Sequence, residues 1–267
     1  MTKLPVNETY YRDHWTHIEP DRFARYLRMF EWSEASRPLL DPAGIKTGEV
    51  VVDLGCGPGF TAFELADWVG PTGHVHGVDL NAEFVAYSQS AARERGLEDS
   101  VTFHRVTDHR LPFTDNAIDC VVAKNVFVYV DDPLQTYQEC RRVLRPGGRV
   151  HAVEGDWGLA ISEPVPDEDW KALIRAASIA FRTPNAGRRL YGYAKAAGFA
   201  DVTVSVVCRP DTTGRLLPLV RNLCTYARES GALEAQKICA ILKQCEEAAN
   251  RQMLLVLIPQ FVVTARR

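Results

Sequence analysis

The chain has 267 residues, 46% of them hydrophobic, and its 31 basic and 34 acidic side chains leave a formal net charge of −3. This length and composition exclude a disordered or collagen-like chain and allow one large domain or two small ones. The balanced charge gives no electrostatic reason to bind nucleic acid or an anionic lipid surface. The longest apolar run, Met253 to Ile258, falls far short of the roughly 20 residues that span a bilayer.

The cysteines and the N-terminal residues indicate the compartment. The seven cysteines are scattered, with no C-x-x-C pair and no zinc-finger spacing, so we expect reduced thiols and no metal site. Charged residues recur through the first thirty positions, which leaves no uncharged stretch for a secretory signal. These features predict a cytoplasmic protein without a membrane span.

From Glu49 onward, short β-branched segments alternate with amphipathic ones, the pattern of βαβ units around a parallel sheet. The segments predict seven strands, at residues 49–54, 74–79, 101–106, 117–123, 149–154, 202–207 and 261–265. Capping residues, glycines and prolines predict helices between them, at about residues 59–69 and 81–95, from Pro133 to before Pro146, and ending at Gly198. The expected fold class is therefore α/β, with one seven-stranded sheet.

Three segments lie outside this alternation. Residues 1–45 are expected to form an N-terminal helical cap, and residues 46–267 the main domain, with helical insertions at about 157–185 and 211–253. Apolar residues recur at helical spacing in the last insertion, which predicts two helices there. These two helices either pack against the core or line a substrate pocket or a dimer interface, and the sequence leaves these alternatives open.

A glycine-rich loop follows the first predicted strand. Its sequence is Asp53-Leu54-Gly55-Cys56-Gly57-Pro58-Gly59. Alternating glycines let the backbone turn sharply and let a ligand approach main-chain atoms at a helix N-terminus. The dinucleotide fingerprint needs a third small residue where this chain has Phe60, which disfavours a pyrophosphate and hence an NAD-dependent oxidoreductase. The acidic Asp53 instead favours a ligand with an ammonium group, and Cys56 is predicted to be a small buried residue rather than a nucleophile.

Asp79 ends the second predicted strand, 79 − 59 = 20 residues after the last glycine of the loop. At this spacing an acidic side chain accepts hydrogen bonds from ribose hydroxyls. The loop and Asp79 together predict a nucleoside ligand.

These residues resemble the class I S-adenosylmethionine-dependent methyltransferases. The glycine loop is similar to the family's first motif and Gly77-Val78-Asp79-Leu80 to its second. Thr107 to Phe113 resembles the stretch whose acid contacts adenine, and Ile118 to Val122 with Arg142 to Gly148 resembles strand four and the turn into strand five. The resemblance covers about residues 45–156 closely. It is greatest to small-molecule enzymes, including the ubiquinone and menaquinone methyltransferases and those of natural-product pathways.

The resemblance implies a Rossmann-like methyltransferase sheet with helical additions forming a lid, S-adenosyl-L-methionine as cofactor, and S-adenosyl-L-homocysteine as product. It implies a set of cofactor-binding residues: Asp53, Gly55, Cys56, Gly57 and Gly59 at the methionine moiety, Asp79 and Leu80 at the ribose, Asp108 and His109 at the adenine, Asn125 near the sulfonium, and Tyr11 from the cap. The implied activity is methyl transfer to a small, partly apolar or aromatic acceptor, in natural-product metabolism. A non-catalytic S-adenosylmethionine-binding protein and an NAD-dependent oxidoreductase are the alternatives, and a homodimer is compatible with the helical additions.

The acceptor side has three catalytic candidates. Glu154 and Asp156 follow the fifth strand and flank Gly155, which would aim both carboxylates to one side, and either could serve as a base. Each could equally cap a helix or pair with an arginine. His14 lies with His17 in an aromatic N-terminal segment and could act as a base near neutral pH, although the same segment could be a helix that packs on the core.

Four arginines cluster near the fifth strand, at positions 141, 142, 145 and 149. Nucleic-acid binding is one interpretation of such a cluster. We expect instead that these side chains complement the dipole of the preceding helix.

Overall fold

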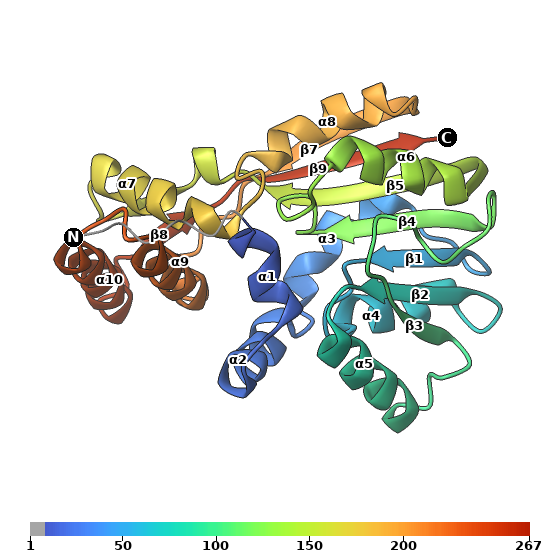
Figure 1. The fold of residues 1–267 in the computed structure, drawn as a ribbon, viewed down its shortest axis with the longest axis horizontal. Coiled ribbons are helices and arrows are strands. Elements are labelled where there is room, and N and C mark those ends of the chain that lie inside the picture. Colours follow the sequence, from blue (N-terminus) through green and yellow to red (C-terminus); the bar gives the residue numbers. More distant parts are fainter. Residues whose placement is uncertain (1–8) are drawn as a thin grey trace.

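The computed structural model describes residues 9–267. Seven strands form one sheet in the order β3-β2-β1-β4-β5-β9-β7 (Figure 1). Their bounds are β1 (Val50–Leu54), β2 (His74–Asp79), β3 (Val101–Arg105), β4 (Ile118–Lys124), β5 (Leu144–Gly155), β7 (Ala200–Val207) and β9 (Gln260–Arg266). Strands β1 to β5 pair in parallel, whereas β9 lies antiparallel between β5 and β7. The α/β fold class and all seven predicted strands are confirmed.

Helices cover both faces of the sheet. One face carries α3 (Arg37–Leu40), α4 (Phe60–Val69) and α5 (Ala82–Glu94), and the other carries α6 (Pro133–Val143) and α8 (Ala186–Ala196). In β1, Val51 packs in the core on the α4 side and Val52 in the core on the α6 side. A strand buried on both faces explains the unbroken valine run, because neither face of a doubly covered parallel sheet meets water.

The helix boundaries follow from local capping. The Asn81 side chain accepts a hydrogen bond from the Phe84 N–H at the start of α5, and Asp132 accepts one from the Gln135 N–H at the start of α6. Gly70 takes a positive φ after α4. Each cap satisfies a backbone group that the helix itself leaves open.

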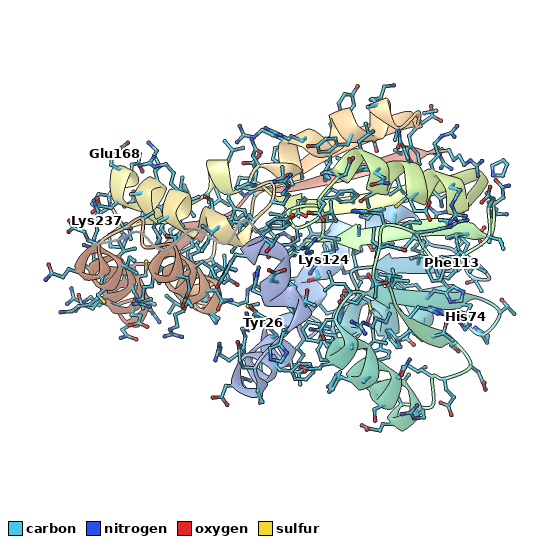
Figure 2. All side chains as sticks on the ribbon, in the orientation of Figure 1. Tyr26, His74, Phe113, Lys124, Glu168 and Lys237 are labelled. Atoms are coloured by element: carbon cyan, nitrogen blue, oxygen red, sulfur yellow. The ribbon has the colours of Figure 1, made fainter. Side chains whose placement is uncertain are left out.

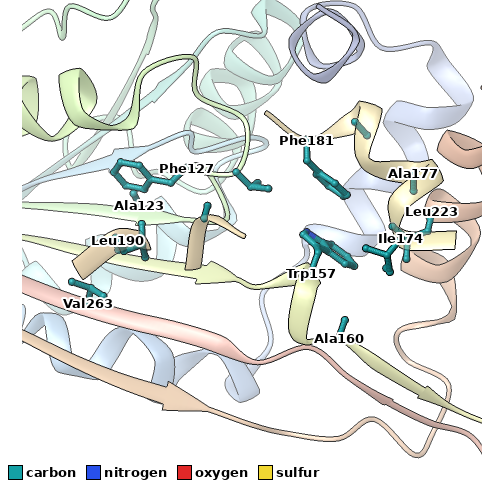
Figure 3. Close-up of a cluster of buried hydrophobic side chains, with 14 of the residues drawn as sticks. Ala123, Phe127, Trp157, Ala160, Ile174, Ala177, Phe181, Leu190, Leu223 and Val263 are labelled. Carbon is teal, nitrogen blue, oxygen red and sulfur yellow. The ribbon is translucent and has the colours of Figure 1, made fainter. Parts of the chain in front are cut away.

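A second group of helices lies beyond one end of the sheet (Figure 1). It comprises α7 (Asp167–Ala177), α9 (Leu217–Ser230) and α10 (Ala235–Asn250), with α1 (Tyr10–Thr16) and α2 (Pro20–Phe30) between it and α5. The two helices predicted in residues 211–253 are confirmed. One hydrophobic core joins this group to the sheet through Trp157, which stacks on Phe181 with ring centroids 5.0 Å apart (Figure 3).

Two features were missed. The short strands β6 (Ile161–Glu163) and β8 (Leu255–Leu257) pair antiparallel in a separate small sheet, because three residues are too few to show an alternating pattern. Strand β5 begins at Leu144, so Pro146-Gly147-Gly148, predicted as a turn, lies inside this strand. The register of the pairing between β4 and β5 shifts between Ile118 and Cys120. The 3-10 helices are η1 (Glu34–Ser36), η2 (Asp41–Ala43), η3 (Trp157–Leu159) and η4 (Ser178–Ala180).

The arginine cluster serves internal ion pairs. Arg149 is buried and forms a bidentate pair with Glu49, with nitrogen to oxygen distances of 2.9 and 2.7 Å. Arg142 binds Glu139, and Arg145 binds Asp119. Arg141 and Arg142 lie in the last turn of α6, whereas Arg145 and Arg149 lie in β5, so the expectation that all four complement the helix dipole is corrected. Arg141 donates to the Gly198 carbonyl. No helix within residues 9–267 has the length and apolarity needed to cross a bilayer.

Candidate active site

A cavity of about 1780 Å³ opens at the carboxyl ends of β1, β2, β4 and β5. The glycine loop and the loops after β2, β3 and β4 line one side of it, and α2 and α9 contribute residues from the helical additions. In α9, Leu223 and Tyr226 are buried in the core and also line the cavity, together with Asn222. The additions therefore pack on the core and also enclose the cavity, so both interpretations of the insertions apply to α9.

The glycine loop reaches the cavity through five of its residues. Leu54 to Pro58 line the cavity, whereas Gly59 does not. A Cβ added at Gly55 would come within 2.5 Å of Val126, and one at Gly59 within 2.9 Å of Phe103. All three glycines have positive φ, which side chains strain to adopt. Gly59 is therefore required by packing at the start of α4 rather than by a ligand, and its assignment to the cofactor is corrected.

Cys56 is buried, and burial raises the pKa of its thiol well above the ordinary value. A thiol in this state is not a nucleophile at neutral pH. The prediction of a small buried residue agrees with this position.

Asp79 joins the end of β2 to the glycine loop. Its carboxylate accepts hydrogen bonds from the Gly57 N–H at 2.8 Å and from the Asn81 N–H at 2.9 Å. Burial raises its pKa, and the same two N–H groups act in the opposite direction. Both Asp79 and Leu80 line the cavity. Each carboxylate oxygen has a second lone pair, so Asp79 can still accept hydrogen bonds from hydroxyl groups of a ligand.

Three more predicted residues line the same cavity from separate loops. Asp108 and His109 follow β3, and the Asp108 side chain accepts a hydrogen bond of 2.9 Å from the Arg110 N–H. Asn125 follows β4 in a left-handed conformation, with a φ of 58°. All three are exposed, so their polar atoms are open to a ligand.

Asp53 lies behind the glycine loop rather than in the cavity lining. It is 2% exposed, and its Oδ2 has no hydrogen-bond partner within the described part of the chain. Burial raises the pKa of this carboxyl to about 7, while Lys124 lowers it. A direct contact between Asp53 and a ligand is therefore not supported, and its influence on the cavity is electrostatic.

Glu154 and Asp156 do not share a side. Glu154 lines the cavity, where its carboxylate accepts hydrogen bonds from the Val128 N–H at 3.0 Å and the Gly155 N–H at 3.1 Å. Burial raises its pKa to about 8. Asp156 lies outside the cavity lining, fully buried, where it binds Arg188 at 2.5 and 2.8 Å and caps η3. The catalytic assignment of Asp156 is thus corrected to a structural ion pair.

The N-terminal histidines and Tyr11 also lie outside the cavity lining. His14 is buried against Tyr10, Trp15 and Tyr226, and burial lowers its pKa to about 4. Tyr11 donates a hydrogen bond to Asp131, which ties α1 to the loop after β4. A buried neutral imidazole packed among aromatic rings is a core residue, so the catalytic role of His14 is corrected. Tyr11 lies outside the cavity lining and binds Asp131, so its cofactor role is corrected as well.

Lys124 is a cavity residue that the sequence analysis missed. It ends β4, which is otherwise buried and mostly apolar, and Figure 2 shows it at the centre of the molecule, where the sheet meets the N-terminal helices. Burial lowers the pKa of its ammonium, while Asp53 and Glu154 raise it. A lysine directly before Asn125, at the end of an apolar strand, was the available signal.

Taken together, the fold and the cavity define a Rossmann-like protein with a cavity at the carboxyl ends of parallel strands, where ligands bind in open α/β sheets. The model of a family described as "Methyltransferase domain" matches residues 45–179, half of the chain. The chain belongs to this methyltransferase domain family.

Named relatives agree with this family. The chain is 36% identical over 212 residues to an uncharacterised 37.1 kDa protein in transposon TN4556 of Streptomyces fradiae, covering 76% of this chain and 60% of that protein. It is 34% identical over 118 residues to the ubiquinone/menaquinone biosynthesis C-methyltransferase of Hahella chejuensis, covering 44% of this chain and 47% of that enzyme. The chain thus spans about half the length of these curated relatives.

Solved structures share the fold. Phosphoethanolamine N-methyltransferase 2 of Haemonchus contortus, solved with S-adenosyl-L-methionine, matches with a TM-score of 0.65 at 18% identity, over 96% of this chain and 60% of that one. The geranyl diphosphate C-methyltransferase of Streptomyces coelicolor matches with a TM-score of 0.57 at 21% identity, over 98% and 88%.

Proposed function

We propose that the protein transfers a methyl group from S-adenosyl-L-methionine to a small, partly apolar or aromatic acceptor. The observation that carries this proposal is that Asp79 both holds the glycine loop and lines a cavity that continues to Glu154 and to aromatic side chains. One continuous cavity therefore offers a polar nucleoside site and an apolar acceptor site.

The residues present fit the cofactor. At Gly57 an added Cβ would project toward Phe30, another residue of the cavity lining, so the missing side chain leaves the space that a ligand needs. Asp79 would hold the ribose hydroxyls, Asp108 and the His109 backbone the adenine, Gly55 to Gly57 the methionine moiety, and Asn125 the region of the sulfonium. The cofactor supplies a methyl group on a positively charged sulfur.

The acceptor side is aromatic. Its lining includes Trp15, Tyr26, Tyr129, Trp157, Phe181 and Tyr226. These rings can orient a flat or apolar acceptor and exclude water, and orientation with desolvation supplies much of the acceleration of a methyl transfer. Of the three catalytic candidates only Glu154 lines the cavity, and we retain it as the acceptor-side residue.

The relatives support a small-molecule acceptor without identifying the molecule. Their names include methyltransferases of ubiquinone and menaquinone biosynthesis, of arsenite and of sterols. A role in natural-product metabolism, a cytoplasmic location, a homodimer and the division into residues 1–45 and 46–267 are further parts of the proposal.

The deciding experiment measures S-adenosylhomocysteine formation from S-adenosylmethionine across a panel of phenols, quinols, amines and indoles. An Asp79→Ala variant serves as the control. Turnover with one acceptor class that is lost in the variant would establish the activity and the nucleophile. Cofactor binding without turnover of any acceptor would favour a non-catalytic S-adenosylmethionine-binding protein, and binding of NADH alone would favour an oxidoreductase.

A further inference from the structure

Lys124 has an unusual position for a lysine. Its side chain lines the cavity at the end of β4, beside Asn125, and within residues 9–267 no carboxylate lies within 4.0 Å of its ammonium nitrogen and no hydrogen bond engages it. Lys124 is half-buried, and a charge with reduced access to water and no partner is costly. The amine is thus held in the cavity without the ion pair that a structural lysine would have.

Two buried carboxyl groups surround this amine at longer range. Asp53 is the second-last residue of β1, behind the glycine loop, and Glu154 is the second-last residue of β5. In the sheet β4 lies between β1 and β5, so the two acids come from the strands on either side of β4. Burial acts on all three groups, raising the pKa of both acids and lowering that of the amine. Burial thus favours the neutral amine, whereas negative charge on Asp53 or Glu154 favours the ammonium.

We propose that Lys124 is a further catalytic residue, which takes the proton of an acidic acceptor hydroxyl, such as that of a phenol or an enol, and holds the resulting oxygen for methylation. This inference rests on the proposed function and narrows its substrate class. The Lys124 ammonium stabilises an anionic oxygen of the acceptor. Beside an amine acceptor, the Lys124 amine and the acceptor amine would both act as bases, and the ammonium would repel any positive charge that the acceptor develops.

The step balances as follows. The acceptor O–H bond breaks and its proton passes to the lone pair of the Lys124 amine, which becomes an ammonium. The acceptor oxygen then forms a bond to the methyl carbon while the carbon–sulfur bond breaks, and the electron pair of that bond stays on sulfur as a neutral thioether. The ammonium later loses its proton to solvent. No oxidant, reductant or metal is required.

The first test uses cofactor binding alone, measured by calorimetry with S-adenosylmethionine and S-adenosylhomocysteine. An ammonium close to the transferring methyl repels the sulfonium of the first ligand and leaves the neutral sulfur of the second unaffected. Lys124→Met should therefore raise the affinity ratio of S-adenosylmethionine to S-adenosylhomocysteine about tenfold at pH 6. The difference from the wild-type protein should shrink as the pH rises and the wild-type amine loses its charge.

Matched variants separate this effect from a general change in charge. Lys243→Met removes an exposed lysine of α10 and should leave the ratio unchanged. Lys124→Arg keeps the positive charge but cannot accept a proton, so it should keep the wild-type ratio at pH 6. An identical ratio in the wild-type and Lys124→Met proteins at every pH would overturn the proposal. Failure of the wild-type protein to bind either ligand would instead contradict the proposed function.

The second test uses pairs of acceptors that differ only in carrying a hydroxyl or an amine on the same aromatic ring. Turnover of the hydroxyl member, lost in both Lys124→Met and Lys124→Arg, supports the proposal, and turnover of the amine member alone overturns it. With no turnover of any pair, the binding ratio decides.

Discussion

The Gly57 N–H donates a 2.8 Å hydrogen bond to the Asp79 carboxylate, which locks the glycine loop to the end of β2. One side chain thus shapes the loop and faces the cavity. Because the two functions share one carboxylate, loss of its charge affects the loop and the ligand together.

Asp79→Asn should weaken S-adenosylhomocysteine binding by about 10- to 100-fold, because hydrogen bonds to a charged group contribute about 1.5–3 kcal/mol. Calorimetry measures the change. Asp99→Asn alters an exposed acid before β3 and should have no effect. Equal affinity in Asp79→Asn and the wild-type protein would contradict the assignment of the ribose site.

Arg149→Met should lower the free energy of unfolding by about 3–5 kcal/mol, because it leaves the Glu49 carboxylate buried without its partner. Urea denaturation followed by circular dichroism measures this. Arg221→Met breaks an exposed ion pair with Glu246 and should cost less than about 1 kcal/mol. Comparable losses in the two variants would show that the Arg149 pair is not buried in solution.

Glu154 and Asp156 should separate in their effects. Glu154→Gln should reduce turnover of the acceptor with little change in stability, since burial raises the pKa of Glu154 to about 8 and the amide resembles the neutral acid. Asp156→Asn should lower stability by about 1–3 kcal/mol by weakening the bond to Arg188. The ratio of turnover to folded protein should stay at the wild-type value in Asp156→Asn, and a selective loss of turnover there would restore Asp156 as a catalytic candidate.

His151 should make the protein sensitive to acid. It is fully buried, bonded to Thr264 and to the Leu39 carbonyl, and burial lowers its pKa to about 4 from 6.5. Its unfolded form therefore binds a proton first as the pH falls, so its contribution to stability is complete above pH 6.5 and is lost between pH 6.5 and 4. In His151→Gln this part of the pH dependence of urea unfolding should disappear. The difference between the two proteins isolates His151 from the acids with raised pKa, which act in the opposite direction. An unchanged slope would show that His151 does not titrate in this range.

The sequence predicted the sheet well because its signals are local. Buried strands such as β4 are apolar runs, and caps such as Asn81 act within one helical turn. Asp79, Asp108 and Asn125 were found for a related reason, since each follows a strand and the carboxyl ends of parallel strands meet at one edge. Strands β6 and β8 were missed because three residues are too few to show an alternating pattern.

Side-chain direction was less predictable than position. Glu154 and Asp156 stand two residues apart, yet the strand ends at Gly155 and the chain turns into η3, so period-two alternation no longer applies. His14 has the composition of a catalytic residue, but its surroundings come from the distant Tyr129 and Tyr226. Lys124 was overlooked because the two acids near it, Asp53 and Glu154, belong to other strands.

The position of β9 imposes an order on folding. β7 pairs with β9 and with no other strand of the described chain, although β7 is synthesised before α9, α10 and β9. The five parallel strands can pair as they are synthesised. Both edges of β7 stay unpaired until β9 has been synthesised and has paired with β5. Since unpaired strand edges invite association with other chains, the helical insertion between β7 and β9 sets how long the growing protein is exposed to that hazard.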